Sequence, residues 1–213
     1  MPQTLRGSAS PRWQRRKEAR PGEIVAAALQ VFVERGFAAT RVEDVARRAG
    51  VTKGTVYLYF DGKEALFKAV VRNTIVPCIA KGEALAEAHT GTARELFLAL
   101  VENWWRLIGE TELSGIPKLM LAEAVNFPEL ARFYHDEVVS RGHRLIASVL
   151  ERGMASGEFR RVDVRAAARL VMAPLLQAAQ WRHSFALCSG EPLDMTKHLA
   201  TYLDIFLNGI SNA

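Results

Sequence analysis

The chain has 213 residues, of which 49% are hydrophobic, and it carries 28 Lys and Arg against 23 Asp and Glu, a formal net charge of +5. This length and composition are typical of a soluble globular protein with one or two domains and a substantial core. The chain contains no run of about 18 uninterrupted apolar residues, and its N-terminus lacks the apolar core of a signal peptide. We therefore expect no membrane span and no export, and a cytoplasmic location.

The positive charge is concentrated near the N-terminus. Residues 1–72 hold 14 Lys and Arg against 7 Asp and Glu, whereas residues 73–213 hold 14 against 16. Because phosphate neutralisation drives much of polyanion binding, this asymmetry favours double-stranded DNA as a partner of the N-terminal part. Residues 1–20 are predicted to form a flexible basic arm, although residues 1–10 fit a solubilising tail better. The basic residues of this arm are Arg12, Arg15, Arg16, Lys17 and Arg20.

The first helix is predicted from Glu23 to Arg35. Its apolar residues recur at the spacing of one buried stripe: Ile24, Ala27, Ala28, Val31 and Phe32. Gly36 follows directly and is expected to end this helix.

The segment from Thr40 to Phe60 predicts two short helices joined by a glycine turn. The first helix has one apolar stripe, formed by Val42, Val45, Ala46 and Ala49. Gly50 is expected to take the left-handed conformation that turns the chain, and Thr52 to cap the second helix. This arrangement is typical of a helix-turn-helix DNA-binding motif, although an ordinary helical corner has the same spacing.

Capping patterns place two helix starts in this region. Thr40 with Glu43 fits the reciprocal capping box, and Asp61 with Glu64 offers a similar arrangement. We therefore expect one helix to begin after Thr40 and another after Asp61.

The second short helix has a distinct outward face. If Val56 and Phe60 point inward, the residues left partly or fully exposed are Lys53, Thr55, Tyr57, Leu58 and Tyr59. A lysine, a hydroxyl and two tyrosines suit phosphates and base edges, and Gly54 lets the backbone come close to a partner.

A longer pattern runs through residues 20–70. It consists of Gly36-Phe37, Thr40, Val45-Ala46, Ala49-Gly50-Val51-Thr52, Gly54-Thr55, Tyr57, Tyr59-Phe60 and Lys63-Glu64-Ala65-Leu66-Phe67. In these residues the chain resembles the TetR family of bacterial transcriptional regulators. It departs from the family at Gly62, where a capping Ser or Asn is more common. The resemblance implies DNA contacts by Thr52, Lys53, Gly54, Thr55, Tyr57 and Tyr59, with Thr40 and Lys63 clamping phosphates. Arg41 completes the predicted DNA-binding set.

Beyond residue 65 the sequence predicts helices throughout, with no alternating strand pattern. The expected helices span residues 63–88 with a bend at Pro77, 92–108, 115–124, 128–155, 163–187 and 193–207. The chain is thus predicted to be all-α with about nine helices. It divides into a helix-turn-helix domain at residues 21–66 and a larger helical domain for effector binding and dimerisation at residues 67–213.

Bulky apolar residues on converging helices of the larger domain are candidates for lining a cavity. The predicted pocket residues are Leu100, Trp104, Met120, Phe127, Phe133, Met172 and Trp181. The family resemblance implies a small-molecule effector here, whose binding shifts the helix that leads back to the DNA-binding motif. For any one of these residues, simple core packing is the favoured alternative.

The last two helices carry more apolar surface than the core of one protomer needs. The predicted dimer interface comprises Leu170, Pro174, Ala178, Leu199, Tyr202, Leu203 and Phe206. Two copies would form a four-helix bundle about a two-fold axis, as in the family. A two-fold dimer requires a near-palindromic operator, with half-sites about 34–36 Å apart or a multiple of this.

The sequence gives little support to catalysis, metal binding or a cofactor. Cys78 and Cys188 lack metal-type spacing, and the five histidines form neither an HExxH helix nor a tight cluster, although His135 and His143 approach one face of the long helix. The leading interpretation is a homodimeric, ligand-responsive repressor. A DNA-binding dimer without ligand sensing is the alternative, favoured by a fully packed interior. An enzyme ranks far below both.

Overall fold

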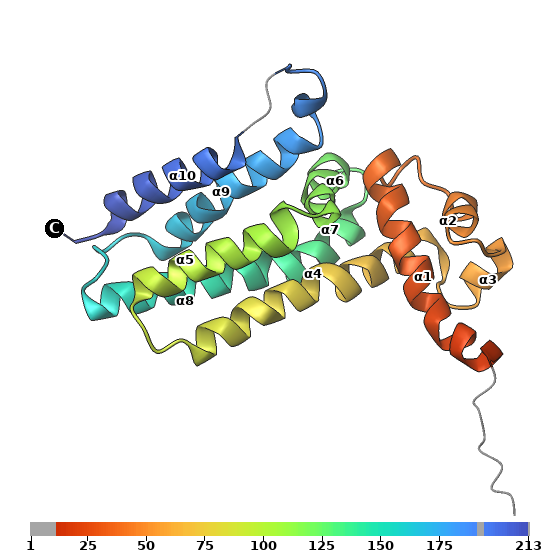
Figure 1. Cartoon of the computed structure of the whole chain (residues 1–213), viewed down its shortest axis with the longest axis horizontal. Coiled ribbons are helices and arrows are strands. Elements are labelled where there is room, and N and C mark those ends of the chain that lie inside the picture. The colour runs from red at the N-terminus through yellow and green to blue at the C-terminus, as the bar shows by residue number, and fades with distance from the viewer. Residues whose placement is uncertain (1–11, 191–193, 213) are drawn as a thin grey trace, which may run out of the picture.

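The computed structural model describes residues 12–190 and 194–212, and these residues form helices with no strand (Figure 1). The α-helices are α1 (Arg12–Arg35), α2 (Val42–Arg48), α3 (Lys53–Tyr57), α4 (Gly62–Ala88), α5 (Ala93–Trp104), α6 (Gly115–Glu123), α7 (Pro128–Tyr134), α8 (Ser140–Ser156), α9 (Val164–Arg182) and α10 (Met195–Ile210). Short π segments, η1 (Trp105–Gly109) and η3 (His135–Val139), continue α5 and join α7 to α8, and 3-10 turns occur at η2 (Glu112–Ser114) and η4 (Phe185–Leu187).

Because α7, η3 and α8 are continuous, the described part of the chain contains nine helical rods. The prediction of an all-α fold with about nine helices is therefore confirmed. The bend expected at Pro77 does not divide α4, which runs through this proline. Within residues 12–190 and 194–212, none of the helices is long and apolar enough to cross a membrane.

The first helix begins earlier than predicted. α1 starts at Arg12, so the basic residues from Arg12 to Arg20 lie within a helix rather than in an arm that precedes it. Arg, Gln, Lys, Glu and Ala are strong helix formers, and the helix runs through Pro21 although this residue has no backbone N–H to donate. The rest of the predicted arm, residues 1–11, lies outside the described residues.

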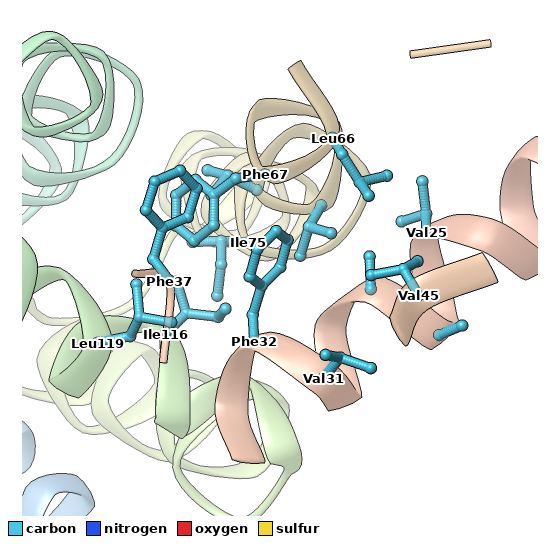
Figure 2. Close-up of a cluster of buried hydrophobic side chains, with 14 of the residues drawn as sticks. Val25, Val31, Phe32, Phe37, Val45, Leu66, Phe67, Ile75, Ile116 and Leu119 are labelled. Carbon is cyan, nitrogen blue, oxygen red and sulfur yellow. The ribbon is translucent and has the colours of Figure 1, made fainter. Parts of the chain in front are cut away.

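An aromatic cluster holds the N-terminal helices together (Figure 2). The ring of Phe32 stacks on Phe37 with centroids 5.6 Å apart, and Phe67 from α4 meets both rings edge-on at 5.4 and 5.7 Å. Ile116 and Leu119 of α6 belong to the same cluster. The hydrophobic core therefore continues from the predicted DNA-binding domain into the larger one.

The larger domain packs around a second cluster. α4, α5 and α8 lie side by side, with α9 and α10 along the outer side of this group (Figure 1). Phe206 of α10 stacks on Phe97 of α5 with ring centroids 5.1 Å apart and planes 5° apart. Stacking of this kind adds to the apolar area that both rings bury.

The caps agree only in part with the sequence patterns. The side chain of Thr52 accepts a hydrogen bond from the Thr55 amide and caps α3 as predicted. The predicted box of Thr40 and Glu43 does not form, because Arg41 takes the N-cap position of α2 and the Thr40 hydroxyl donates to other carbonyls. Asp61 occupies the N-cap of α4 without a side-chain cap bond.

Two glycines of α8 give a matched test of packing. A Cβ at Gly153 would overlap the buried ring of Phe159, whereas a Cβ at Gly142 would meet nothing within 4 Å. We expect Gly153→Ala to lower the free energy of unfolding by about 1–2 kcal/mol, since overpacking outweighs the gain in helix propensity. Gly142→Ala should raise it by about 0.5–1 kcal/mol. Urea unfolding at a fixed protein concentration measures both, and equal effects at the two positions would contradict this packing.

Candidate functional sites: an exposed helix and a buried cavity

The turn between α2 and α3 is built by backbone geometry. Gly50 has φ 64°, which a residue with a Cβ adopts only with strain, and the Val51 amide donates to the Ala46 carbonyl at 2.9 Å. Val56 is 1% exposed and anchors α3 to the core. α3 lies at the end of the molecule opposite α10 (Figure 1).

The outward face of α3 is polar and aromatic. Lys53 and Gly54 are exposed, and Tyr57 and Leu58 retain 48% and 81% of their accessible surface. Thr55 and Tyr59 are half-buried, and the Thr55 and Thr52 hydroxyl oxygens lie 2.9 Å apart. Arg41 is also exposed, at the start of α2. The side chains thus take the orientation predicted from the helical spacing.

Lys53 is paired in the free protein. Its ammonium group forms an ion pair with Glu43 of α2 and lies 5.7 Å from the centre of the Tyr57 ring. Hydrogen bonding within this pair raises the pKa of Lys53 and lowers the pKa of Glu43. Both groups are exposed, so a phosphate is able to compete with the carboxylate for the lysine.

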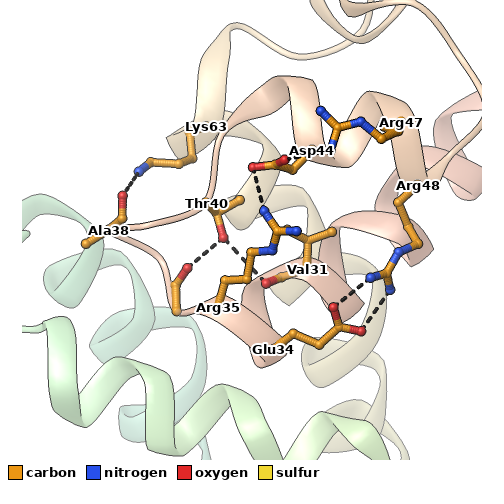
Figure 3. Close-up of polar contacts among 10 residues, drawn as sticks. Val31, Glu34, Arg35, Ala38, Thr40, Asp44, Arg47, Arg48 and Lys63 are labelled. Atoms are coloured by element: carbon orange, nitrogen blue, oxygen red, sulfur yellow. Dashed lines mark hydrogen bonds and ion pairs between the residues drawn. The ribbon is translucent and has the colours of Figure 1, made fainter.

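Thr40 and Lys63, which were predicted to clamp phosphates, hold the loop between α1 and α2 (Figure 3). Thr40 is 2% exposed, and its hydroxyl donates to the Gly36 carbonyl at 2.6 Å. Lys63 donates to the carbonyls of Phe37 at 2.7 Å and Ala38 at 3.1 Å, and burial lowers its pKa. The physical reason is local: carbonyls at the end of α1 lack helical partners and take these donors. Thr40 is buried, so the prediction of a side-chain phosphate contact was wrong for this residue, whereas for the half-buried Lys63 it stays a prediction.

Ion pairs join α1 to α2 near this loop (Figure 3). Arg48 of α2 forms a bidentate ion pair with Glu34 of α1. Asp44 of α2 forms ion pairs with Arg35 of α1 at 3.0 Å and with Arg47 of its own helix at 3.3 Å. These ion pairs partly neutralise several of the basic side chains that give the N-terminal part its positive charge. Helical periodicity in the sequence does not reveal such pairing.

The larger domain contains a cavity of about 400 Å³, partly open to solvent, between α4, α5, α6, α7, α8 and α9. Four of the predicted pocket residues line it: Leu100, Trp104, Met120 and Met172. Most of the other lining side chains are apolar, among them Ile75, Ile79, Val101, Ile108, Leu121, Val138, Val139, Leu145, Ile146, Val171, Leu175 and Leu176. A mostly apolar lining with few polar groups is typical of small-molecule sites.

Three predicted pocket residues lie elsewhere. Phe127 packs edge-on against Phe37, Phe133 lies beneath the cations of Lys68 and Arg72, and Trp181 packs against Phe185. Their positions follow from helix geometry. Residues 131, 134, 135 and 138 form the cavity-facing stripe at i, i+3, i+4 and i+7, which places residue 133 on another face.

Polar groups also line the cavity, at Cys78, Asn103, Tyr134, His135 and His143. Of these, Cys78, Asn103, His135 and His143 were not predicted as pocket residues. The spacing of His135 and His143 on one helical face was the available signal. Within the described residues, no cluster of three or more His, Cys, Asp or Glu side chains is arranged to hold a metal ion.

α6 contacts both the cavity and the loop between α1 and α2. Met120 and Ala124 line the cavity. Glu123, on another face of α6, is 9% exposed and accepts a hydrogen bond from the Ala38 amide at 2.9 Å. One short helix therefore connects the interior of the larger domain to the support of α2 and α3.

Only part of the predicted dimer interface is free on the surface. Leu170 is 64% exposed, whereas Pro174, Leu199, Leu203 and Phe206 are half-buried. Ala178 and Tyr202 are buried within the protomer, where the Tyr202 hydroxyl donates to the Val171 carbonyl at 2.9 Å. The prediction was wrong for these last two, because α10 needs them to pack on α9. Ile205 of α10 is a further large apolar residue on the surface, 68% exposed.

Comparison with known proteins agrees with this architecture. Residues 24–70 match the model of the bacterial regulatory proteins of the tetR family, and residues 94–209 match the C-terminal domain of AefR-like transcriptional repressors. The fatty acid metabolism regulator protein of Bacillus subtilis is 24% identical over 200 residues, covering 92% of this chain and 99% of that protein. The HTH-type transcriptional repressor KstR2 of Rhodococcus jostii is 27% identical over 198 residues, covering 92% and 93%.

Solved structures share the fold. The ketosteroid transcriptional regulator KstR2 of Mycobacterium tuberculosis superposes with a TM-score of 0.72 at 24% identity, covering 91% of this chain and 96% of that one. FadR of Bacillus subtilis, solved in complex with stearoyl-CoA, gives a TM-score of 0.72 at 22% identity, covering 89% and 98%. With both halves of the chain matched and the helix-turn-helix and helical domain in place, the chain belongs to the TetR family of bacterial transcriptional regulators.

Proposed function

We propose that this chain is a homodimeric repressor that binds a near-palindromic operator through α3 and leaves it when a lipid-like molecule fills the cavity. One observation carries this proposal: α6 lines the cavity with Met120 and Ala124 and holds the loop before α2 through Glu123. A ligand that prefers one position of α6 therefore has a direct mechanical route to the DNA-binding helices.

The DNA-binding surface consists of the exposed face of α3 with Arg41 at the start of α2. Lys53 exchanges its contact with Glu43 for a phosphate, and Tyr57 and Thr52 lie beside it on the same face. Gly54 allows the backbone of α3 to approach the duplex. Thr55 and Tyr59 are half-buried and border this surface.

The second copy joins through α9 and α10. Leu170 and Ile205 expose large apolar side chains on these helices, and burial of such residues favours association. A two-fold axis through this face would present two α3 helices to half-sites one or more helical turns apart.

The effector is proposed to be lipid-like because of the cavity lining. A largely apolar space of about 400 Å³ favours an apolar molecule. The names of similar proteins agree, since one regulates fatty acid metabolism, one is a ketosteroid regulator and one was solved with stearoyl-CoA. The alternative, a DNA-binding dimer without sensing, would be favoured by a fully packed interior, and the cavity argues against it.

The DNA-binding surface is tested by removing one charge at each end of the molecule. We expect Lys53→Ala to weaken binding to every DNA sequence and to reduce the slope of log affinity against log salt by about 1, because one phosphate contact is lost. Lys197→Ala removes the same charge from α10. Operator affinity is measured by fluorescence anisotropy over a salt series, with an operator selected from random DNA. Equal losses in the two variants would contradict the assigned surface.

The sensing role is tested by filling the cavity. Ala124 lines it, whereas Ala122 of the same helix is exposed and does not. We expect the operator affinity of Ala124→Trp not to respond to added ligands, since the indole occupies the space that they need. Ala122→Trp should respond like the unmodified protein. The measurement is operator release by panels of fatty acyl-CoA and ketosteroid compounds. Release that is equally strong in both variants would place the effector elsewhere.

A further inference from the structure

We infer that the part of the ligand inside the cavity is uncharged and that its polar group accepts a hydrogen bond from the hydroxyl of Tyr134. This inference rests on the proposed function in one respect, that the cavity binds a ligand. It goes further by assigning the chemical class of that ligand, a neutral lipophile with a carbonyl or hydroxyl oxygen, and the residue that recognises it.

Tyr134 carries the argument because its hydroxyl has no hydrogen-bond partner among the described residues. The residue lines the cavity and is only 8% exposed, and within the described residues its hydroxyl makes no hydrogen bond. The hydroxyl oxygen is not among the fully enclosed unpaired atoms, so it keeps some accessible surface, and a molecule that enters the cavity is able to pair with it. The other buried tyrosine, Tyr202, satisfies its hydroxyl within the protomer by donating to the Val171 carbonyl.

The protonation state of Tyr134 makes it a donor. Burial raises the pKa of its phenol, so the hydroxyl keeps its proton at every pH at which the protein would be studied. A carbonyl or hydroxyl oxygen of a ligand is the complementary acceptor.

The rest of the cavity gives no support to a charged ligand. None of the described residues that line it is Asp, Glu, Lys or Arg. His143 lines the wall, and burial, with Arg169 and His135 nearby, lowers its pKa, which favours the neutral imidazole. An unpaired carboxylate or ammonium group would therefore lose its hydration without receiving an opposite charge, which costs far more than burying a carbonyl.

Two arginines close in sequence to the cavity-lining residues form ion pairs between helices. Arg141 contacts Glu83 at 2.6 Å, and Arg72 contacts Glu137 at 3.1 Å. Both pairs join α4 to the rod formed by η3 and α8. These two arginines are therefore occupied in the free protein.

The test compares three probes of similar length in the full-length dimer: 2-undecanone, decanoate and decylammonium. Binding is followed by isothermal calorimetry at neutral pH, with the fluorescence of Trp104, which lines the cavity, as a second signal. We expect 2-undecanone to bind at least tenfold more tightly than either ion. Equal or tighter binding of decanoate or decylammonium, or no binding of the ketone, would overturn the assignment of an uncharged ligand.

Two conservative variants separate recognition from structure. Tyr134→Phe should weaken the binding of 2-undecanone about 2- to 10-fold, the range expected for one neutral hydrogen bond, and leave the urea midpoint unchanged. Binding of pentylbenzene, which has no oxygen, should be the same in Tyr134→Phe and in the unmodified protein. Tyr202→Phe should do the reverse, lowering the urea midpoint and leaving ketone affinity intact.

The outcomes distinguish this inference from the proposed function. Unchanged ketone affinity in Tyr134→Phe, or an equal loss for pentylbenzene, overturns the role of Tyr134. A ketone that binds as expected but leaves the operator complex intact supports the ligand class and contradicts release by cavity filling.

Discussion

The position of the DNA-binding helices depends on how the loop between α1 and α2 is held. Residues at the end of α1 leave carbonyls and amides without helical partners, and three side chains from different parts of the chain supply them. Thr40 bonds to the Gly36 carbonyl, Lys63 of α4 to the carbonyls of Phe37 and Ala38, and Glu123 of α6 accepts from the Ala38 amide. Buried polar contacts of this kind are costly to leave unmade, so they fix one arrangement.

The same loop is also packed by aromatic rings. Phe37 lies between Phe32, Phe67 and Phe127, which come from α1, α4 and the start of α7. Close-packed interiors resist small continuous deformations and respond by changing between discrete arrangements. A shift of α6 therefore disturbs both the hydrogen bond at Glu123 and the ring packing. Both contacts support the loop that positions α2 and α3.

The cavity explains why α6 is suited to this role. Its residues divide between two surroundings: Met120 and Ala124 meet the cavity, and Glu123 meets the loop. A coupling of 1–3 kcal/mol between ligand and DNA requires only a modest preference of the ligand for one position of α6. The uncharged lining with its single unpaired tyrosine hydroxyl makes this preference depend on shape and on one hydrogen bond.

The amino-acid pattern alone was enough to predict several features that depend on neighbours within a turn or two, although not the caps of α2 and α4. The all-helical fold, the glycine turn at Gly50, the Thr52 cap and the outward face of α3 all follow from local spacing and backbone preference. Leu100, Trp104, Met120 and Met172 were placed at the cavity because each lies on a helical face that must meet other helices.

Tertiary structure alone decided which partner each side chain took. Lys63 has the chemistry to bind phosphate, but in the folded chain its ammonium group donates to the carbonyls of Phe37 and Ala38, which lie far from it in sequence. Phe133 and Tyr134 are adjacent aromatic residues on different faces of α7, and the packing of α7 against α4 and η3 decides which of these faces meets the cavity. Periodicity tells which way a residue faces along its own helix, whereas the partner it meets depends on contacts between segments far apart in the chain.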